Sequence, residues 1–165
     1  MKNYSVRFSG VCAMLLLLIA CGTESSDVEL VELDLLSEGM PIVINAPVNP
    51  LIESKTLGVD RVMTVRKGSD FYLDIFEVNA VNRDKKAIKS KLLRDVQGHP
   101  YYQKIISDDD NGFIYQTAVD SSYVNYGFRY FHLQGDKEYV FQTGMSGQYT
   151  LDDVQLMYDA VKQGE

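Results

Sequence analysis

Hydrophobic and polar positions alternate along residues 40–163 in a way that predicts short strands and two helices. Two apolar runs in residues 60–78 flank Lys67-Gly68-Ser69, which predicts a tight hairpin. In the second run, which begins at Phe71, both alternate sets of positions are largely apolar. A half-solvated antiparallel strand would alternate more cleanly, so we expect a sheet that is covered on both faces.

Three further stretches extend the expected sheet. Residues 40–47 form a short apolar run bounded by prolines, which cannot donate to the middle of a ladder. Residues 101–119 contain two runs joined by Asn111-Gly112, a dipeptide that tolerates the positive φ of tight turns. Residues 127–144 contain two runs around Gly135, again apolar on both faces. We expect about five to six strands in the central sheet.

The first expected helix occupies residues 84–97. Asn82 or Asp84 can cap its N-terminus, and Gly98 and Pro100 end it in the usual order. Its apolar residues recur about every four positions and form one stripe, consisting of Ile88, Leu92, Leu93 and Val96.

The second expected helix occupies residues 151–163. Thr150 and Asp153 have the spacing of a capping box, and Asp152 lies where the positive end of the helix dipole favours an acid. Its buried stripe consists of Leu151, Val154, Met157, Tyr158 and Val161.

The two-faced strands and the two helices together predict an α+β fold. We expect a three-layer α/β/α sandwich, with a central antiparallel sheet and one helix on each face. The sequence GDKEYVFQT at 135–143, followed by the capped helix, resembles the end of the PsbP-like fold. That resemblance extends over roughly residues 40–163. It implies a non-enzymatic assembly or binding protein and brings no catalytic residues, and a fold alone does not define a function.

The N-terminal residues have the layout of a secretory signal peptide. Lys2 and Arg7 precede a short apolar block that is well below the roughly 20 residues of a spanning helix. The sequence Leu18-Ile19-Ala20-Cys21 resembles the lipobox of bacterial lipoproteins. The resemblance implies that residues 1–20 are removed and that Cys21 carries a lipid and becomes the first mature residue.

Two other interpretations of Cys21 stay open. A disulfide to Cys12, the only other cysteine, would lie inside the export signal. An uncleaved membrane anchor conflicts with the short apolar block.

Residues 21–39 are expected to form a lipidated cysteine followed by an acidic tether, and residues 40–165 to form one globular domain. The start of the tether, GTESSD, has nothing to bury, whereas the later VELVELDLL carries apolar residues that can contact the domain. An acid soon after the cysteine resembles lipoproteins of the Bacteroidetes group, some of which reach the cell surface. We therefore expect a bacterial envelope protein at the outer membrane, on its periplasmic side or at the cell surface.

The charge of the chain restricts its partners. The formal net charge is −7, and residues 21–165 carry 14 basic against 23 acidic residues, which gives −9. An acidic chain repels phosphate backbones and anionic lipid surfaces. We therefore expect no nucleic acid partner, and attachment to the membrane through the N-terminal lipid alone, which requires more than one acyl chain.

No motif predicts a metal or a cofactor. Asp108-Asp109-Asp110-Asn111-Gly112 suggests a calcium loop, but with Gly112 at the sixth position the twelfth falls on Ala118 instead of a bidentate glutamate. His99 and His132 have no second histidine or cysteine at metal-ligand spacing. Gly144-Met145-Ser146-Gly147 lacks the second glycine of a nucleophile elbow at the required place.

Aromatic residues are dense in one region of the chain. Tyr123, Tyr126 and Tyr130 form a candidate binding patch for a glycan, a peptide or another envelope protein. The alternative is that these rings fill the core of a chain that contains no tryptophan.

Two classes of function remain. The first is a non-catalytic envelope lipoprotein that binds or assembles something, and the second is a small envelope enzyme with an unrecognised active site. The absence of any nucleophile–base or ligand motif favours the first class. A deep pocket with convergent polar groups would favour the second.

Overall fold

The computed structural model describes residues 28–162 of the 165-residue chain. Its strands are β1 (Leu30–Asp34), β2 (Val43–Pro47), β3 (Leu51–Leu57), β4 (Asp60–Lys67), β5 (Phe71–Asn79), β6 (Tyr102–Asp108), β7 (Gly112–Asp120), β8 (Tyr123–Gln134) and β9 (Lys137–Thr143). Its helices are α1 (Lys85–Gln97) and α2 (Leu151–Val161), with a short 3-10 helix, η1, at Leu36–Glu38. Within the described residues, no helix has the length and hydropathy needed to cross a bilayer.

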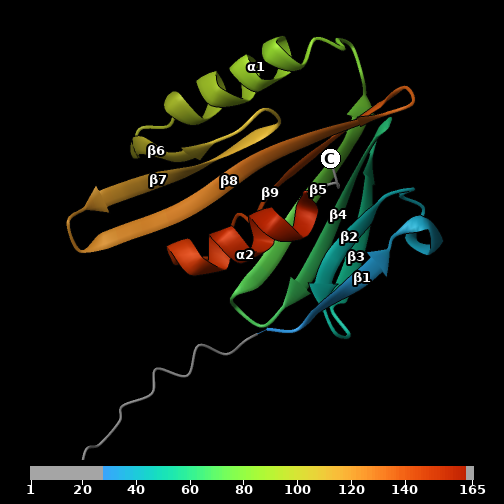
Figure 1. The fold of residues 1–165 in the computed structure, drawn as a ribbon, viewed down its shortest axis with the longest axis horizontal. Coiled ribbons are helices and arrows are strands. Elements are labelled where there is room, and N and C mark those ends of the chain that lie inside the picture. Colours follow the sequence, from blue (N-terminus) through green and yellow to red (C-terminus); the bar gives the residue numbers. More distant parts are fainter. Residues whose placement is uncertain (1–27, 163–165) are drawn as a thin grey trace, which may run out of the picture.

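The strands form one large antiparallel sheet and one small one (Figure 1). The large sheet has seven strands in the order β3-β4-β5-β9-β8-β7-β6, and β1 pairs with β2 in a separate two-stranded sheet. The expected α+β class with a large antiparallel sheet and two helices is confirmed. The large sheet has seven strands instead of the expected five to six, because it includes β3, which was not recognised. The run at 40–47, which was expected in this sheet, forms β2 and pairs with β1 in the small sheet instead.

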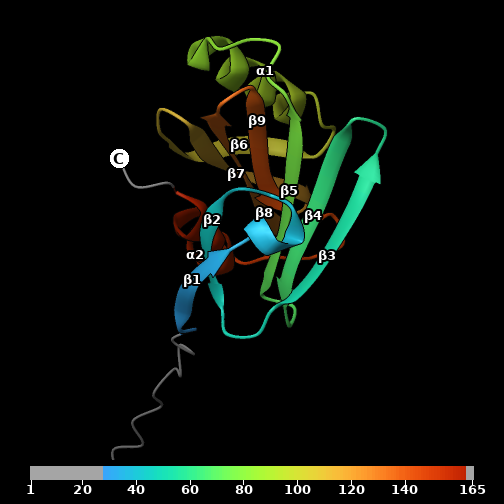
Figure 2. The same ribbon diagram turned by 90° about the vertical axis from the view of Figure 1, so that its right-hand side faces the viewer.

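The two helices pack against different sets of strand residues. Consecutive residues of a strand point to opposite faces, and Tyr130 packs with α2 whereas Phe131 packs with α1. Figures 1 and 2 show α2 beside the β1–β2 hairpin and α1 well away from both. We call the side of the sheet that carries α2 and the hairpin the α2 face, and the opposite side the α1 face.

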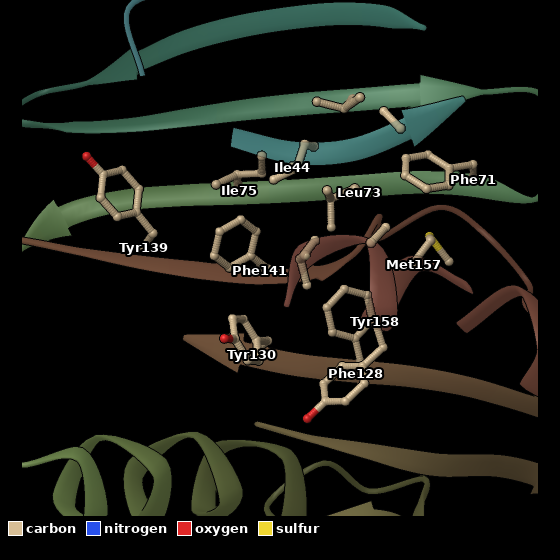
Figure 3. Packing of buried hydrophobic residues seen from close by; sticks show 14 of the residues in the cluster. Ile44, Phe71, Leu73, Ile75, Phe128, Tyr130, Tyr139, Phe141, Met157 and Tyr158 are labelled. Atoms are coloured by element: carbon tan, nitrogen blue, oxygen red, sulfur yellow. The ribbon is translucent and has the colours of Figure 1, made fainter. Parts of the chain in front are cut away.

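The main core lies on the α2 face. Figure 3 shows side chains of β5, β9 and β8 gathered near Tyr158 and Met157 of α2. The Tyr158 ring meets the rings of Phe128 and Tyr130 edge-on, with centroids 5.5 and 5.9 Å apart. Such edge-to-face aromatic pairs stabilise the fold beyond the burial of their area.

Both helices begin at the residues that the sequence indicates. The Asp84 carboxylate accepts hydrogen bonds from the backbone N–H groups of Lys86 and Ala87, at 2.9 and 3.4 Å. Thr150 and Asp153 form a full capping box at the start of α2. These bonds satisfy backbone donors that have no partner inside a helix.

The globular domain begins before residue 40, so the expected boundary between tether and domain is wrong. β1 pairs with β2 from Leu30 to Asp34, and Leu35 is fully buried in the main core. The guanidinium of Arg61 donates to the carbonyl of Gly39 and ties η1 to β4. The acidic residues of β1, Glu32 and Asp34, are exposed, which explains why the composition resembles that of a tether.

Candidate functional site

The lipobox residues Leu18, Ile19 and Ala20 and the expected lipid-bearing residue Cys21 lie outside the described residues. The structure therefore leaves this part of the sequence analysis as a prediction.

The expected aromatic patch is not assembled on the surface. Tyr130 is only 4% exposed and its ring packs against Phe141 in the core, whereas Tyr123 is 47% exposed at the start of β8. Tyr126 is half-buried against the main core. Tyr123 also lies an odd number of positions from the other two, so it points to the opposite face of the sheet. The patch prediction is therefore wrong for these three residues as a group.

The acidic turn between β6 and β7 holds elements together. Asp109 accepts a hydrogen bond from the Tyr158 hydroxyl at 2.6 Å, and Lys162 approaches the same carboxylate at 3.5 Å. Asp108 pairs with Lys89 of α1 at 2.7 Å. The turn thus links both helices, and among residues 28–162 no group of three or more histidine, cysteine or acidic side chains is placed to hold a metal.

A cleft of about 360 Å³ opens on the α1 face, at the C-terminal end of α1. Its walls come from the end of α1 and the following loop, from β7, β8 and β9, and from residues 144–149. Ligand pockets in proteins commonly measure about 300–1,000 Å³, so this cleft has the size for a small molecule.

One wall of the cleft is fixed by Asn125. Its amide nitrogen donates to the Gly147 carbonyl at 3.4 Å, and its amide oxygen accepts from the Tyr149 backbone N–H at 2.7 Å. The Tyr149 hydroxyl donates to the Gly144 carbonyl at 3.0 Å, which closes the loop on itself. A Cβ on Gly147 would lie 2.0 Å from the Tyr149 ring, so glycine is required for this close approach. Gly147, the last residue of Gly144-Met145-Ser146-Gly147, therefore has a packing role.

Arg129 and Tyr115 also line the cleft. The Arg129 side chain is half-buried and lies over the Tyr115 ring, with its Cζ 5.7 Å from the ring centroid. Arg129 Nη1 donates to the Tyr115 hydroxyl at 3.4 Å and to the Phe128 carbonyl at 3.0 Å. A Cβ on Gly127 would lie 2.7 Å from the Tyr115 ring, so the glycine allows Tyr115 to lie flat against β8.

A row of polar side chains crosses the α1 face beside the cleft. Directly paired residues share a face, and the register pairs Asp74 with Gln142 and Gln142 with Arg129. Gln142 lines the cleft, and among the described residues its side-chain amide has no hydrogen-bond partner. The Asp74 carboxylate is 5% exposed and accepts a hydrogen bond from the Thr64 hydroxyl at 2.8 Å.

The carboxyl of Asp74 is perturbed by its surroundings. Burial raises the pKa of Asp74, and the hydrogen bonds from Thr64 and from the Met145 backbone oppose part of that rise. The group therefore resists ionisation more than an exposed aspartate does.

Asp95 and His99 complete the polar lining, at the rim of the cleft. The His99 Nδ1 accepts a hydrogen bond from the Tyr101 backbone N–H at 3.3 Å. A neutral ring with this contact carries its proton on Nε2, which leaves a donor for another group. The cleft thus combines one cation, one carboxylate, an amide and an imidazole with tyrosine rings.

Comparison with known proteins identifies no relative: no family model, no curated protein and no solved structure matches this chain.

Sequence reasoning missed the cleft residues Arg129 and Gln142. A signal was present, because Arg129 stands between Phe128 and Tyr130 inside a run that is apolar on both faces. A charged residue at such a position needs a polar partner or an opening to solvent.

Proposed function

We propose that this protein is a membrane-anchored lipoprotein of the bacterial envelope whose domain binds a small molecule without catalysis. The observation that carries the proposal is the cleft on the α1 face, because a hollow of ligand size with a few convergent polar groups is the usual form of a binding site.

The hydrogen bonds inside the cleft favour binding over catalysis. Two hydroxyls in its walls donate to backbone carbonyls: Thr117 to Asn125 at 3.4 Å, and Tyr149 to Gly144. Neither is bonded to His99, whereas an activated nucleophile needs a base within hydrogen-bond reach. The second candidate is a small envelope enzyme, supported by the presence of Asp95 and His99 at the same rim.

The proposed anchor is the lipid on Cys21. The lipobox-like Leu18-Ile19-Ala20-Cys21 supports it, together with a net charge of −9 for residues 21–165, which disfavours attachment to anionic lipid by charge alone. The proposed location is the outer membrane, on the periplasmic side or at the cell surface, and the partners do not include nucleic acid.

We also retain two finer structural proposals. One is the three-layer α/β/α arrangement, supported by the packing of α1 and α2 against opposite faces. The other is the PsbP-like likeness, supported by the turn and strand at 135–143 followed by a capped helix.

The binding proposal is tested with the full chain in detergent. Immobilised protein is equilibrated with a protein-free extract of bacterial small molecules, and retained compounds are identified by mass spectrometry. Thr117→Phe fills the cleft with a residue that strands accept. We expect at least one compound to be retained by the wild type and lost from the variant. If the two proteins retain the same compounds, or the wild type retains none, the proposal fails.

The anchor proposal is tested by Cys21→Ser. Buried acyl chains contribute about 0.8 kcal/mol per CH₂, so the wild type should stay with membranes through high-salt washes. The variant should be neither acylated nor processed normally. Release of the wild type by salt without detergent, or cleavage of the variant after Ala20, would contradict the anchor.

A further inference from the structure

Arg129 is the cation of the cleft, and its charge is not neutralised within the described residues. The four ion pairs found in residues 28–162 all involve lysines: Lys89, Lys137, and Lys162 twice. The half-buried guanidinium of Arg129 instead contacts a tyrosine ring, a tyrosine hydroxyl and a backbone carbonyl. A partly desolvated charge without a counter-ion is a costly arrangement, and an anion in the cleft would relieve it.

The donors of Arg129 are only partly used. Both of its hydrogen bonds come from Nη1, so the N–H groups of Nε and Nη2 have no partner among the described residues. The guanidinium presents its donors as a planar fork that matches the two oxygens of a carboxylate. The Gln142 amide, directly across the register from Arg129, offers a further N–H group.

We propose that the cleft binds a small organic carboxylate, with the carboxylate on Arg129 and an apolar body against the ring of Tyr115 and the side chain of Val96. This inference rests on the proposed binding function and specifies its ligand class. The lining offers contacts for both the carboxylate and the apolar body of such a ligand, because tyrosine residues and Val96 line the cleft together with the polar groups.

The charge of the lining favours a carboxylate over a phosphate. Arg129 and Asp95 are the charged residues that line the cleft, so their formal charges cancel when His99 is neutral. A phosphate group carries up to two negative charges and is usually held by several cations or backbone N–H groups. A singly charged carboxylate fits one guanidinium. The Asp95 carboxylate can then accept a hydrogen bond from a hydroxyl or amine elsewhere on the ligand.

The test is calorimetric titration of the detergent-solubilised full chain. The probes are 3-phenylpropionate and hexanoate, the uncharged amides of both, and inorganic phosphate. Small ligands of this kind bind weakly, so titrations extend to about 10 mM. We expect at least one carboxylate to bind about tenfold or more tightly than its amide, which is the effect of losing a charge-assisted bidentate contact.

Four variants identify the site. Arg129→Gln should remove the preference for carboxylate over amide, and Arg129→Lys should give an intermediate affinity because it keeps the charge but loses the fork. Arg66→Gln is the matched control: Arg66 lies over Tyr72 with its Cζ 5.6 Å from the ring centroid, outside the cleft, and its loss should leave binding unchanged. Thr117→Phe should abolish binding. The melting temperature of each variant establishes that it is folded.

The outcomes separate this inference from the binding proposal. Equal affinity for carboxylate and amide, unchanged in Arg129→Gln and lost in Thr117→Phe, overturns the carboxylate class but leaves a binding cleft. Binding of phosphate alone, or of no probe, also overturns the carboxylate class. If Thr117→Phe binds as the wild type does, the probes occupy another site and both proposals fail.

Discussion

The two faces of the large sheet are built in different ways. On the α2 face, 21 buried residues form one continuous core with α2 and the β1–β2 hairpin. On the α1 face, the buried cluster has five members, Ile88, Leu92, Val96, Phe113 and Phe131. The α1 face also holds the cleft and the polar row from Asp74 to Arg129. The α2 face therefore carries most of the hydrophobic stabilisation, and the lightly packed α1 face has room for a ligand.

The helices themselves explain this difference. The 11 residues of α2 include five buried ones, whereas the 13 residues of α1 include three. α1 is rich in lysine and covers only part of its face, because its apolar stripe is narrow. The strand residues at its C-terminal end are largely half-buried, and the cleft lies there.

The largest expected difference between the two faces is the loss in the free energy of unfolding when a large buried side chain is replaced by alanine. Phe141 is fully buried in the main core, so Phe141→Ala should lower the free energy of unfolding by about 3–5 kcal/mol. Leu92→Ala, in the small cluster, should cost about 2 kcal/mol, at the low end for leucine, because a lightly packed site collapses more easily. Urea unfolding followed by circular dichroism measures both values. Equal losses would show that the two faces contribute alike.

The β1–β2 hairpin is expected to act as part of the α2 face. Leu35→Ala should lower the free energy of unfolding by about 2–4 kcal/mol, because the side chain is fully buried between the hairpin and the sheet. Leu36→Ala is the matched control, since Leu36 is 62% exposed, and it should change stability by less than about 0.5 kcal/mol. The same urea titrations compare the two. A small effect of Leu35→Ala would mean that residues 30–38 belong to the tether and do not contribute to the stability of the domain.

Sequence reasoning succeeded where the signals are local. Caps such as Asp84 and Thr150 lie next to the helices they begin, and glycine turns such as Gly68 and Gly135 lie within the hairpins they close. Each signal is interpretable without knowledge of distant contacts.

The missed strands and the cleft depend on contacts that are remote in the sequence. β1 has an acid-rich sequence, and β3, at the sheet edge, is largely exposed, so neither has a clear apolar alternation. The cleft brings together residues from Asp95 to Tyr149, and only the register of β7, β8 and β9 places them side by side. The aromatic patch failed for the same reason: the composition does not state which face of β8 each ring occupies.

Substitution of the N-cap residue of each helix tests how strongly that helix packs against the rest of the fold. Thr150→Ala removes the capping box of α2 and should lower the free energy of unfolding by about 1 kcal/mol. Asp84→Ala removes a similar cap from α1, but we expect a smaller global effect and faster amide hydrogen exchange within α1, because a lightly packed helix opens locally. Exchange measured by mass spectrometry distinguishes the helices. If α1 is as protected as α2 in the wild type, the contrast between faces is wrong.

The smallest expected effect is the pH dependence contributed by Asp74 on the α1 face. Burial raises the pKa of Asp74 in the folded state, so the folded chain binds the proton more tightly than the unfolded chain, in which the aspartate pKa is about 3.9. This stabilising contribution is complete below the unfolded pKa and is lost as pH rises through the folded pKa.

Asp74→Asn should therefore reduce the loss of stability between the unfolded and the folded pKa of Asp74. Urea unfolding of the wild type and the variant across pH 3.5–7 measures this difference in the free energy of unfolding. About seven pH values suffice, since one group titrates over roughly two pH units. Asp120→Asn is a control, because the contribution of Asp120 to stability changes with pH in the opposite direction. Hydrogen bonds from the Ser122 side chain and from the Ser122 and Tyr123 backbone lower the pKa of Asp120, so its contribution is present above the unfolded pKa and lost as pH falls. If the difference curve for Asp74 slopes like that for Asp120, the hydrogen bonds of Asp74 outweigh its burial, and Asp74 carries a stable charge in the polar row, separated from Arg129 by Gln142.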